Sequence, residues 1–207
     1  MKNDEKSFEN LLDVFKIRLP VNFRIVESSP YAKDLEMLLE NKILPGLKNL
    51  KDAEGNCVPL PFKLPWYPSN LVYQYNANKT DLRRVEEYES LKSLLIKSTD
   101  CGHVTRQEAV SLIPVLFADI KSDSRILEMC AAPGSKTTQI IESLESEIKK
   151  DGENVSIEKR GFLVCNDVNA KRMHMLIGRT KPLSCSRAVY VCHDARFFPN
   201  LHDTVYF

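Results

Sequence analysis

Apolar and polar residues alternate most clearly near the start of the chain. Residues 20–27 place Val21, Phe23 and Ile25 on one side of an extended segment and Asn22 and Arg24 on the other, which predicts a half-buried strand. Apolar residues then recur at helical spacing between Ser29, which would cap a helix, and Pro45, which would stop it. The same spacing predicts another helix over residues 80–97.

Two further segments of this first half carry local signals. Residues 59–68 contain four prolines and therefore predict an extended surface segment rather than a helix. Thr105 and Glu108 have the spacing of a capping box, and a packing helix kinked at Pro114 is predicted behind them over residues 109–120.

Beyond residue 123 the pattern becomes one of strand, turn and helix. Apolar runs predict strands at residues 125–128, 161–165 and 188–192, and helical spacing predicts helices at residues 137–144 and 170–178. The chain is expected to end just before a fourth strand, around residues 204–207. Such alternation is typical of a parallel doubly wound sheet. The predicted fold class is therefore α/β, the first half of a Rossmann-like sheet preceded by a small α+β segment, with domains at residues 1–104 and 105–207.

Composition narrows the function classes. With 29 basic and 28 acidic side chains the net charge is +1, so a nucleic-acid surface would have to be local. The longest uncharged apolar stretch, residues 109–118, is far shorter than the ~20 residues of a membrane span. The N-terminus is mixed in charge and does not resemble a signal peptide. The six cysteines and four histidines lack metal-ligand spacing, which predicts no metal site and a reducing intracellular compartment.

Each predicted strand of the second half ends in an acid. Glu128 closes the first strand, Asp167 follows the second and Asp194 closes the third. Ligands of open parallel sheets bind outside the carboxyl ends of the strands, so these acids should converge on one crevice. An acid after the second strand could accept from ribose hydroxyls, and one after the third from an adenine amine. The small residues at 129–136 would let a ligand approach the backbone, and together these features predict a site for an adenosine-containing ligand.

The strand-end acids and the loop after Glu128 also have alternative interpretations. An acid at a strand end can simply cap the next helix, and that alternative stays open for each acid. A nucleotide-triphosphate loop is disfavoured because Ser135 precedes Lys136 and the earlier glycine is missing. A dinucleotide-binding fold is disfavoured because no Gly-x-Gly-x-x-Gly motif occurs.

Residues 126–138, Ile-Leu-Glu-Met-Cys-Ala-Ala-Pro-Gly-Ser-Lys-Thr-Thr, closely resemble the S-adenosylmethionine motif of the Sun-domain RNA cytosine-5 methyltransferases. Residues 105–111 resemble the segment upstream of that motif, and residues 64–68 resemble the nuclear tRNA-modifying branch. The resemblance implies S-adenosyl-L-methionine as cofactor, RNA and specifically tRNA as partner, and the nucleus, including the nucleolus, as location. Glu128 stands where the family more often has Asp.

The resemblance also implies roles for individual residues. The methionine part of the cofactor would be held by the loop Cys130, Ala131, Ala132, Pro133, Gly134, Ser135 and Lys136. Asp167 would hold the ribose and Asp194 the adenine. Family members add a cysteine thiolate to cytosine carbon 6, and that cysteine lies in a Thr-Cys motif, with a second one in Pro-Cys-Ser-Gly.

Neither cysteine motif occurs in the 207 residues, so no catalytic residue is assigned. We expect an N-terminal portion of a methyltransferase that lacks turnover by itself. The alternative is a non-catalytic cofactor- or RNA-binding protein that retains half of the fold. For RNA contacts, a local charge of +5 between Asp167 and Asp194 (Lys171, Arg172, Arg179, Lys181 and Arg187) could meet phosphates or form a solvated helix face, and both interpretations stay open.

Overall fold

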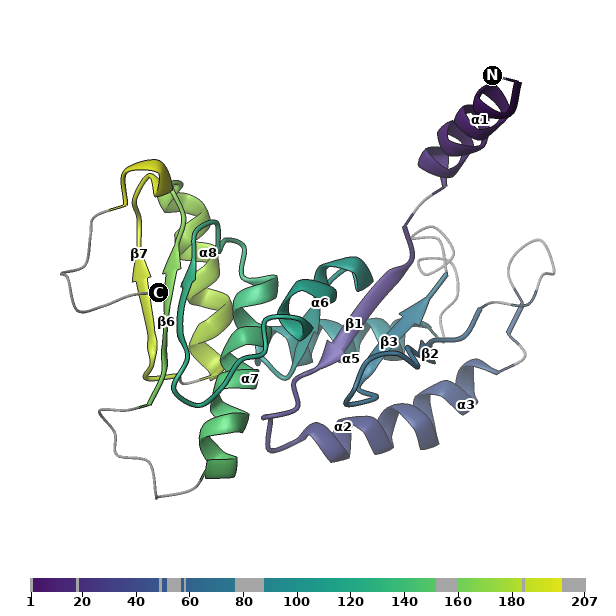
Figure 1. Ribbon diagram of the computed structural model, residues 1–207. Helices are drawn as coiled ribbons and strands as arrows, with labels where there is room; N and C mark the ends of the chain where they lie inside the picture. The colour runs from purple at the N-terminus through teal and green to yellow at the C-terminus, as the bar shows by residue number, and fades with distance from the viewer. Residues whose placement is uncertain are drawn as a thin grey trace.

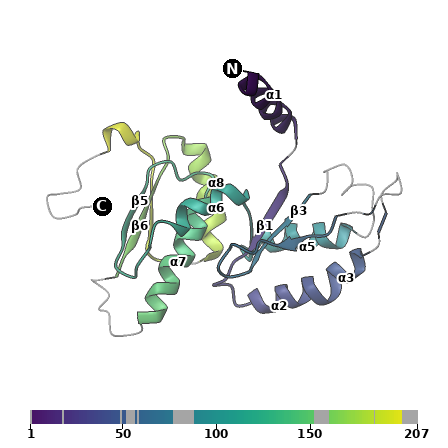
Figure 2. The same ribbon diagram turned by 45° about the vertical axis from the view of Figure 1, so that its right-hand side comes forward.

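The computed structural model describes residues 2–17, 19–48, 50–51, 57, 59–76, 88–151, 160–183 and 185–198. Within these residues the chain forms an antiparallel sheet from its first half and a parallel sheet from its second, with helices between and around them (Figure 1). Helix α1 (Lys2–Lys16) stands apart from both sheets in the two views (Figures 1 and 2). No described helix is long and apolar enough to cross a membrane.

The antiparallel sheet has the strand order β2-β3-β1-β4. Its strands are β1 (Val21–Ile25), β2 (Phe62–Lys63), β3 (Val72–Tyr75) and β4 (Val104–Arg106). One face packs on α2 (Ala32–Leu38), the π-helical η1 (Leu39–Ile43), α3 (Leu44–Leu47) and α5 (Tyr88–Asp100). Phe23 and Tyr73 stack within this core with ring centroids 5.2 Å apart. The first half of the chain is thus the predicted α+β segment.

The strand predicted over residues 20–27 is confirmed, but its half-burial is wrong. Asn22 is 6% exposed and Arg24 is 2% exposed, so both faces of β1 are covered. The second face packs against α6 (Ala109–Leu116) and α7 (Ser135–Asp151), whose residues supply polar partners. The polar residues at alternate positions predicted that this face would contact solvent. Instead, the face is covered and Arg24 forms an ion pair with Glu142.

Two predictions about helix ends and proline differ from the structure. The helix after Ser29 begins at Ala32 and continues through η1 and α3 to Leu47, because Pro45 lies in the first turn of α3, where a missing amide costs nothing. The proline-rich residues 59–68 form no helix and contain the extended strand β2, as predicted, but they lie only partly on the surface, since Leu64 and Tyr67 are buried.

The capping box predicted at Thr105 is also wrong. Thr105 belongs to β4 and pairs with Arg24 of β1, so its backbone is committed to the sheet. Glu108 takes the N-cap position of α6 without a side-chain bond, and the helix ends at Leu116 rather than at residue 120. The helix predicted over 80–97 is confirmed from Tyr88 onward, and its residues 80–87 lie outside the described part of the chain.

The parallel sheet has the order β5-β6-β7, with β5 (Arg125–Glu128), β6 (Phe162–Asn166) and β7 (Ala188–Val191), which confirms all three predicted strands. The helices α7 and α8 (Ala170–Thr180) connect them and run longer than predicted. Each strand is added on the same side of the one before it. Right-handed crossovers therefore place both helices on the same face of the sheet (Figures 1 and 2). Residues 204–207, which were expected to come just before a fourth strand, lie outside the described part of the chain.

Candidate functional site

The loop between β5 and α7 is fastened to the end of the neighbouring strand. The amide of Ala131 donates to the carbonyl of Asn166 at 2.7 Å, and that of Ala132 donates to the Asp167 carboxylate at 3.2 Å. Gly134 closes the loop with a φ of +100°, a conformation that favours glycine, and a Cβ there would lie 2.5 Å from Leu176. The Ala132–Pro133 peptide bond is cis. The loop is therefore held at the carboxyl end of the sheet.

Asp167 is buried at the end of β6, with 2% of its surface exposed. Besides Ala132, its carboxylate accepts from the Asn169 amide at 3.0 Å, and the Arg172 guanidinium lies 3.5 Å away. Arg172 also donates to the carbonyl of Ala132. Each Asp167 oxygen retains a lone pair, so the group can accept a further donor next to the loop.

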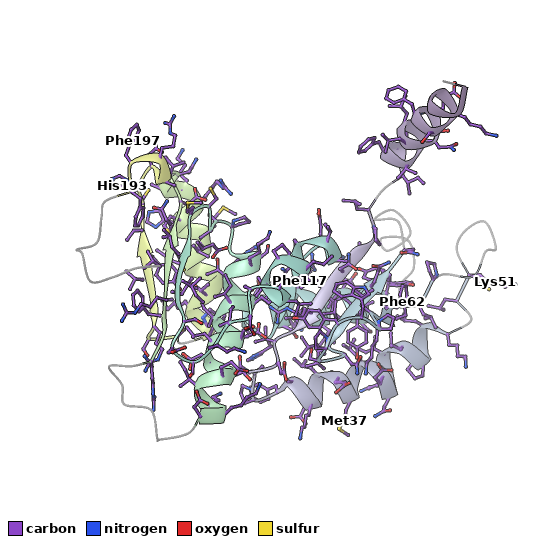
Figure 3. The ribbon with its side chains drawn as sticks, in the orientation of Figure 1. Met37, Lys51, Phe62, Phe117, His193 and Phe197 are labelled. Atoms are coloured by element: carbon purple, nitrogen blue, oxygen red, sulfur yellow. The ribbon has the colours of Figure 1, made fainter. Side chains whose placement is uncertain are left out.

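Asp194 follows β7 and caps the short helix η5 (Ala195–Phe197). Its carboxylate accepts from the amide and the guanidinium of Arg196, which holds the pKa of Asp194 below its usual value. The helix-cap alternative is thus realised for this acid, which remains partly exposed as a possible acceptor. Figure 3 shows its neighbours His193 and Phe197 at this end of the sheet.

The ends of the three strands are joined by Asn166, a residue that the sequence did not single out. Asn166 is fully buried and donates to the carbonyls of Met129 and His193, while its side-chain oxygen accepts from the His193 amide. It therefore connects the segments that follow β5 and β7. An asparagine directly after an apolar run was the only available signal.

Glu128, at the end of β5, accepts from the Thr137 hydroxyl at 2.6 Å. Burial raises the pKa of its carboxyl group to about 7, and the Thr137 hydrogen bond and the charge of Lys136 offset this only in part. A carboxyl group that titrates near neutrality in a cleft is a candidate for a functional site.

A cleft of about 600 Å³ lies between this loop and the antiparallel sheet. All but one of the predicted loop residues line it: Cys130, Ala131, Ala132, Pro133, Ser135 and Lys136. Gly134 lines a small cavity next to it, while Asp167 and Asp194 line neither. The opposite wall comes from Asn22, Arg106 and Gln107, which the sequence did not predict because they lie far from the loop in the chain. The volume is in the range of cofactor sites.

Metal binding has no support in the described part of the chain, where no group of three or more His, Cys, Asp or Glu residues could hold an ion. The buried Cys165 packs among β6 and α8 residues, and burial raises the pKa of its thiol. The arrangement can hold a ligand through carboxylates and backbone amides. Of the three strand-end acids only Glu128 lines the cleft, so the predicted convergence of all three on one crevice does not hold for this cleft.

Comparison with known proteins agrees with this geometry. Residues 115–207 match the family model described as 16S rRNA methyltransferase RsmB/F. Over 95% of this chain, 38% of residues are identical to the multisite-specific tRNA:(cytosine-C(5))-methyltransferase of Saccharomyces cerevisiae, of which the match covers 28%. A tRNA (cytosine(34)-C(5))-methyltransferase of Drosophila melanogaster is 35% identical over 97% of the chain and 27% of its own length.

The fold is shared with solved structures. A methyltransferase homologue from Pyrococcus horikoshii superposes with a TM-score of 0.56 at 17% identity, covering 89% of this chain and 47% of that one. The chain therefore has the Rossmann-like methyltransferase fold and spans less than a third of the length of these curated relatives. Its sequence matches are thus with RNA cytosine-5 methyltransferases, the group whose cofactor motif residues 126–138 resemble.

Proposed function

We propose that this chain carries the cofactor site of an S-adenosyl-L-methionine-dependent RNA cytosine-5 methyltransferase that acts on tRNA. The observation that carries the proposal is the cleft-lining loop, Cys130 to Lys136, bound through Ala132 to the buried Asp167. The two curated relatives described above are named tRNA cytosine methyltransferases, which favours tRNA as substrate. By the same resemblance we assign the protein to the nucleus.

In this proposal each group has a physical role. The loop backbone and the start of α7 meet the methionine part of the cofactor, Asp167 accepts from the ribose hydroxyls, and Asp194 accepts from the adenine amine. Bound S-adenosylmethionine supplies a methyl group on a sulfonium centre. The carboxylate of Glu128 favours a cationic ligand in the cleft when it is ionised.

Asp167→Ala tests the assignment by calorimetry with S-adenosylmethionine. Loss of a hydrogen bond to a charged acceptor costs about 1.5–3 kcal/mol, so affinity should fall about 10- to 150-fold. Asp123→Ala is the matched control, because this exposed acid lies before β5, at the opposite end of the sheet. Unchanged affinity in Asp167→Ala would contradict the cofactor site.

A non-catalytic cofactor- or RNA-binding protein is the second candidate. No cysteine of these 207 residues follows Thr or Pro, as the family motifs require, so an experiment has to separate the two candidates. Methyl transfer to tRNA by the protein that contains this chain, lost when Asp167 is replaced, would exclude it.

A further inference from the structure

Two arginines that line the cleft, one on each side of it, have no acidic partner among the described residues. Arg106 ends β4 and Arg179 lies in the last turn of α8, and both line the main cleft and the adjoining cavity of about 60 Å³. Both side chains are exposed, and neither forms an ion pair with any residue that the structure describes. Arg179 makes one hydrogen bond, to the Pro133 carbonyl at 3.3 Å. Two separate elements thus bring guanidinium groups to one place.

Two residues that line the cleft each have a buried amide oxygen without a partner among the described residues. Asn22 Oδ1 and Gln107 Oε1 accept no hydrogen bond from the described residues, although these residues are only 6% and 5% exposed. Their amide nitrogens are already engaged, that of Asn22 with the Pro20 carbonyl and that of Gln107 with Ser111 and Gln139. Because each amide nitrogen already donates a hydrogen bond, the oxygen is the side-chain atom that lacks a partner. A buried acceptor left unpaired is unfavourable, so a ligand that donates to it is favoured.

The charge of the cleft is positive on balance. Lys136 joins the two arginines, and the acids that line the cleft are Glu108 and Glu128. Because the pKa of Glu128 lies at about 7, that carboxyl group is only partly ionised at neutral pH. A ligand that combines anionic groups with hydroxyl donors therefore matches the cleft.

We propose that Arg106 and Arg179 bind phosphates of the substrate RNA strand while the amide oxygens of Asn22 and Gln107 accept from its 2′-hydroxyl groups. The inference rests on the proposed function, and it deepens it by naming the contact surface. Phosphate oxygens accept charge-assisted hydrogen bonds from guanidinium groups. The 2′-hydroxyl is the group that distinguishes RNA from DNA, and it donates where these oxygens accept.

The structure also separates the predicted basic residues. Arg179 reaches the cleft, whereas Arg187 precedes β7 and so lies at the amino end of the sheet, away from the cofactor loop. Arg125, the first residue of β5, lies at the same amino end. These two arginines provide a control with an equal change of charge.

The test measures binding of a fluorescently labelled, single-stranded, cytosine-containing RNA as a function of salt. Each phosphate contact with a single strand contributes about 0.7 to the slope of log affinity against log salt. The double variant Arg106→Gln/Arg179→Gln removes two contacts, so the magnitude of this slope should decrease by about 1.4. At 0.1 M salt this corresponds to affinity lower by about 25-fold. Arg125→Gln/Arg187→Gln should keep the parent slope. A parent slope in the first variant, or equal losses in both, would overturn the phosphate assignment.

Two further measurements complete the test. The parent chain should bind RNA several-fold more tightly than DNA of the same sequence, and equal binding would overturn the role of the amide oxygens. Calorimetry with S-adenosylmethionine on the parent chain separates the two proposals. Absent cofactor binding contradicts the proposed function, whereas bound cofactor with an unchanged salt slope contradicts only the RNA surface. All four substituted arginines lie on the surface or are half-buried, and circular dichroism melting checks that each variant is folded.

Discussion

Glu128 shows how burial changes a single side chain at this site. Its carboxyl group has an ordinary pKa of 4.5 and a value of about 7 in the folded chain, because burial disfavours the ionised form. The folded state therefore binds this proton more tightly than the unfolded state. The resulting stabilisation is fully present below pH 4.5 and is lost as pH rises through 7.

Glu128→Gln removes this dependence. A pKa difference of 2.5 units corresponds to about 3 kcal/mol, so the variant should have a higher free energy of unfolding than the parent at pH 8 by up to that amount. Near pH 4 the two should be equal, since both side chains are then neutral. Denaturant unfolding at the two pH values measures the effect, with Glu108→Gln as an exposed control in the same cleft. A gain of the same size at both pH values would show that charge is not its cause.

At the residue scale, the sequence predicted what lies close together in the chain. The loop from Cys130 to Lys136 is one continuous run, and six of its seven residues line the cleft. Asn22 and Gln107 were missed because they reach the cleft only through the pairing of β1 with β4, which brings together residues about 80 positions apart. No local pattern carries that information.

At the element scale, an ion pair joins β1 to α7. The Arg24 Nη1 atom lies 2.6 and 2.5 Å from the two carboxylate oxygens of Glu142, and both side chains are almost fully buried. The Glu142 carboxylate also accepts from the amide of Glu27 at 3.1 Å. A second link runs from Gln139 to the Tyr67 hydroxyl and the Leu112 carbonyl. These bonds fix the antiparallel sheet against the helix that follows the cofactor loop.

Glu142→Leu should destabilise the chain by about 3–5 kcal/mol, because it leaves the Arg24 guanidinium buried without its partner. Arg24→Met/Glu142→Leu should recover most of this loss, since two apolar side chains no longer require a partner. Denaturant unfolding measures both variants. Glu147→Ala, which removes a surface partner of Lys150, should cost less than about 1 kcal/mol. A double variant no more stable than Glu142→Leu would mean that packing, not charge, dominates at this contact.

Periodicity predicted elements well where packing agrees with it and failed where tertiary contacts decide. The three parallel strands are short apolar runs, of which the central strand β6 is buried, and all three were predicted. Thr105 has the local signal of a helix cap, but pairing with β1 places it in a strand. Pro45 was predicted to end the helix, but it follows the π-helical segment η1 and lies in the first turn of α3, where proline is tolerated.

At the scale of the whole molecule, the two faces of the parallel sheet differ. Met173 and Leu176 of α8 and Ile141 of α7 pack on one face together with Leu163 and Cys165. No described helix covers the other face (Figures 1 and 2). Val189, in β7 at the edge of the sheet that the described residues form, is 51% exposed. Edge strands with exposed apolar residues are sites of association.

We therefore expect the 207-residue chain to self-associate through this sheet, with an apparent mass in sedimentation velocity that rises with concentration. Val189→Lys should shift the chain toward the monomer, because a charge on an edge strand opposes pairing with a second copy. Met37→Lys is the matched control: Met37 is 60% exposed but lies on α2, away from the parallel sheet (Figure 3). A parent chain that stays monomeric at all concentrations would contradict the prediction. Equal dispersal by the two lysine variants would show that added charge, rather than the sheet face, controls association.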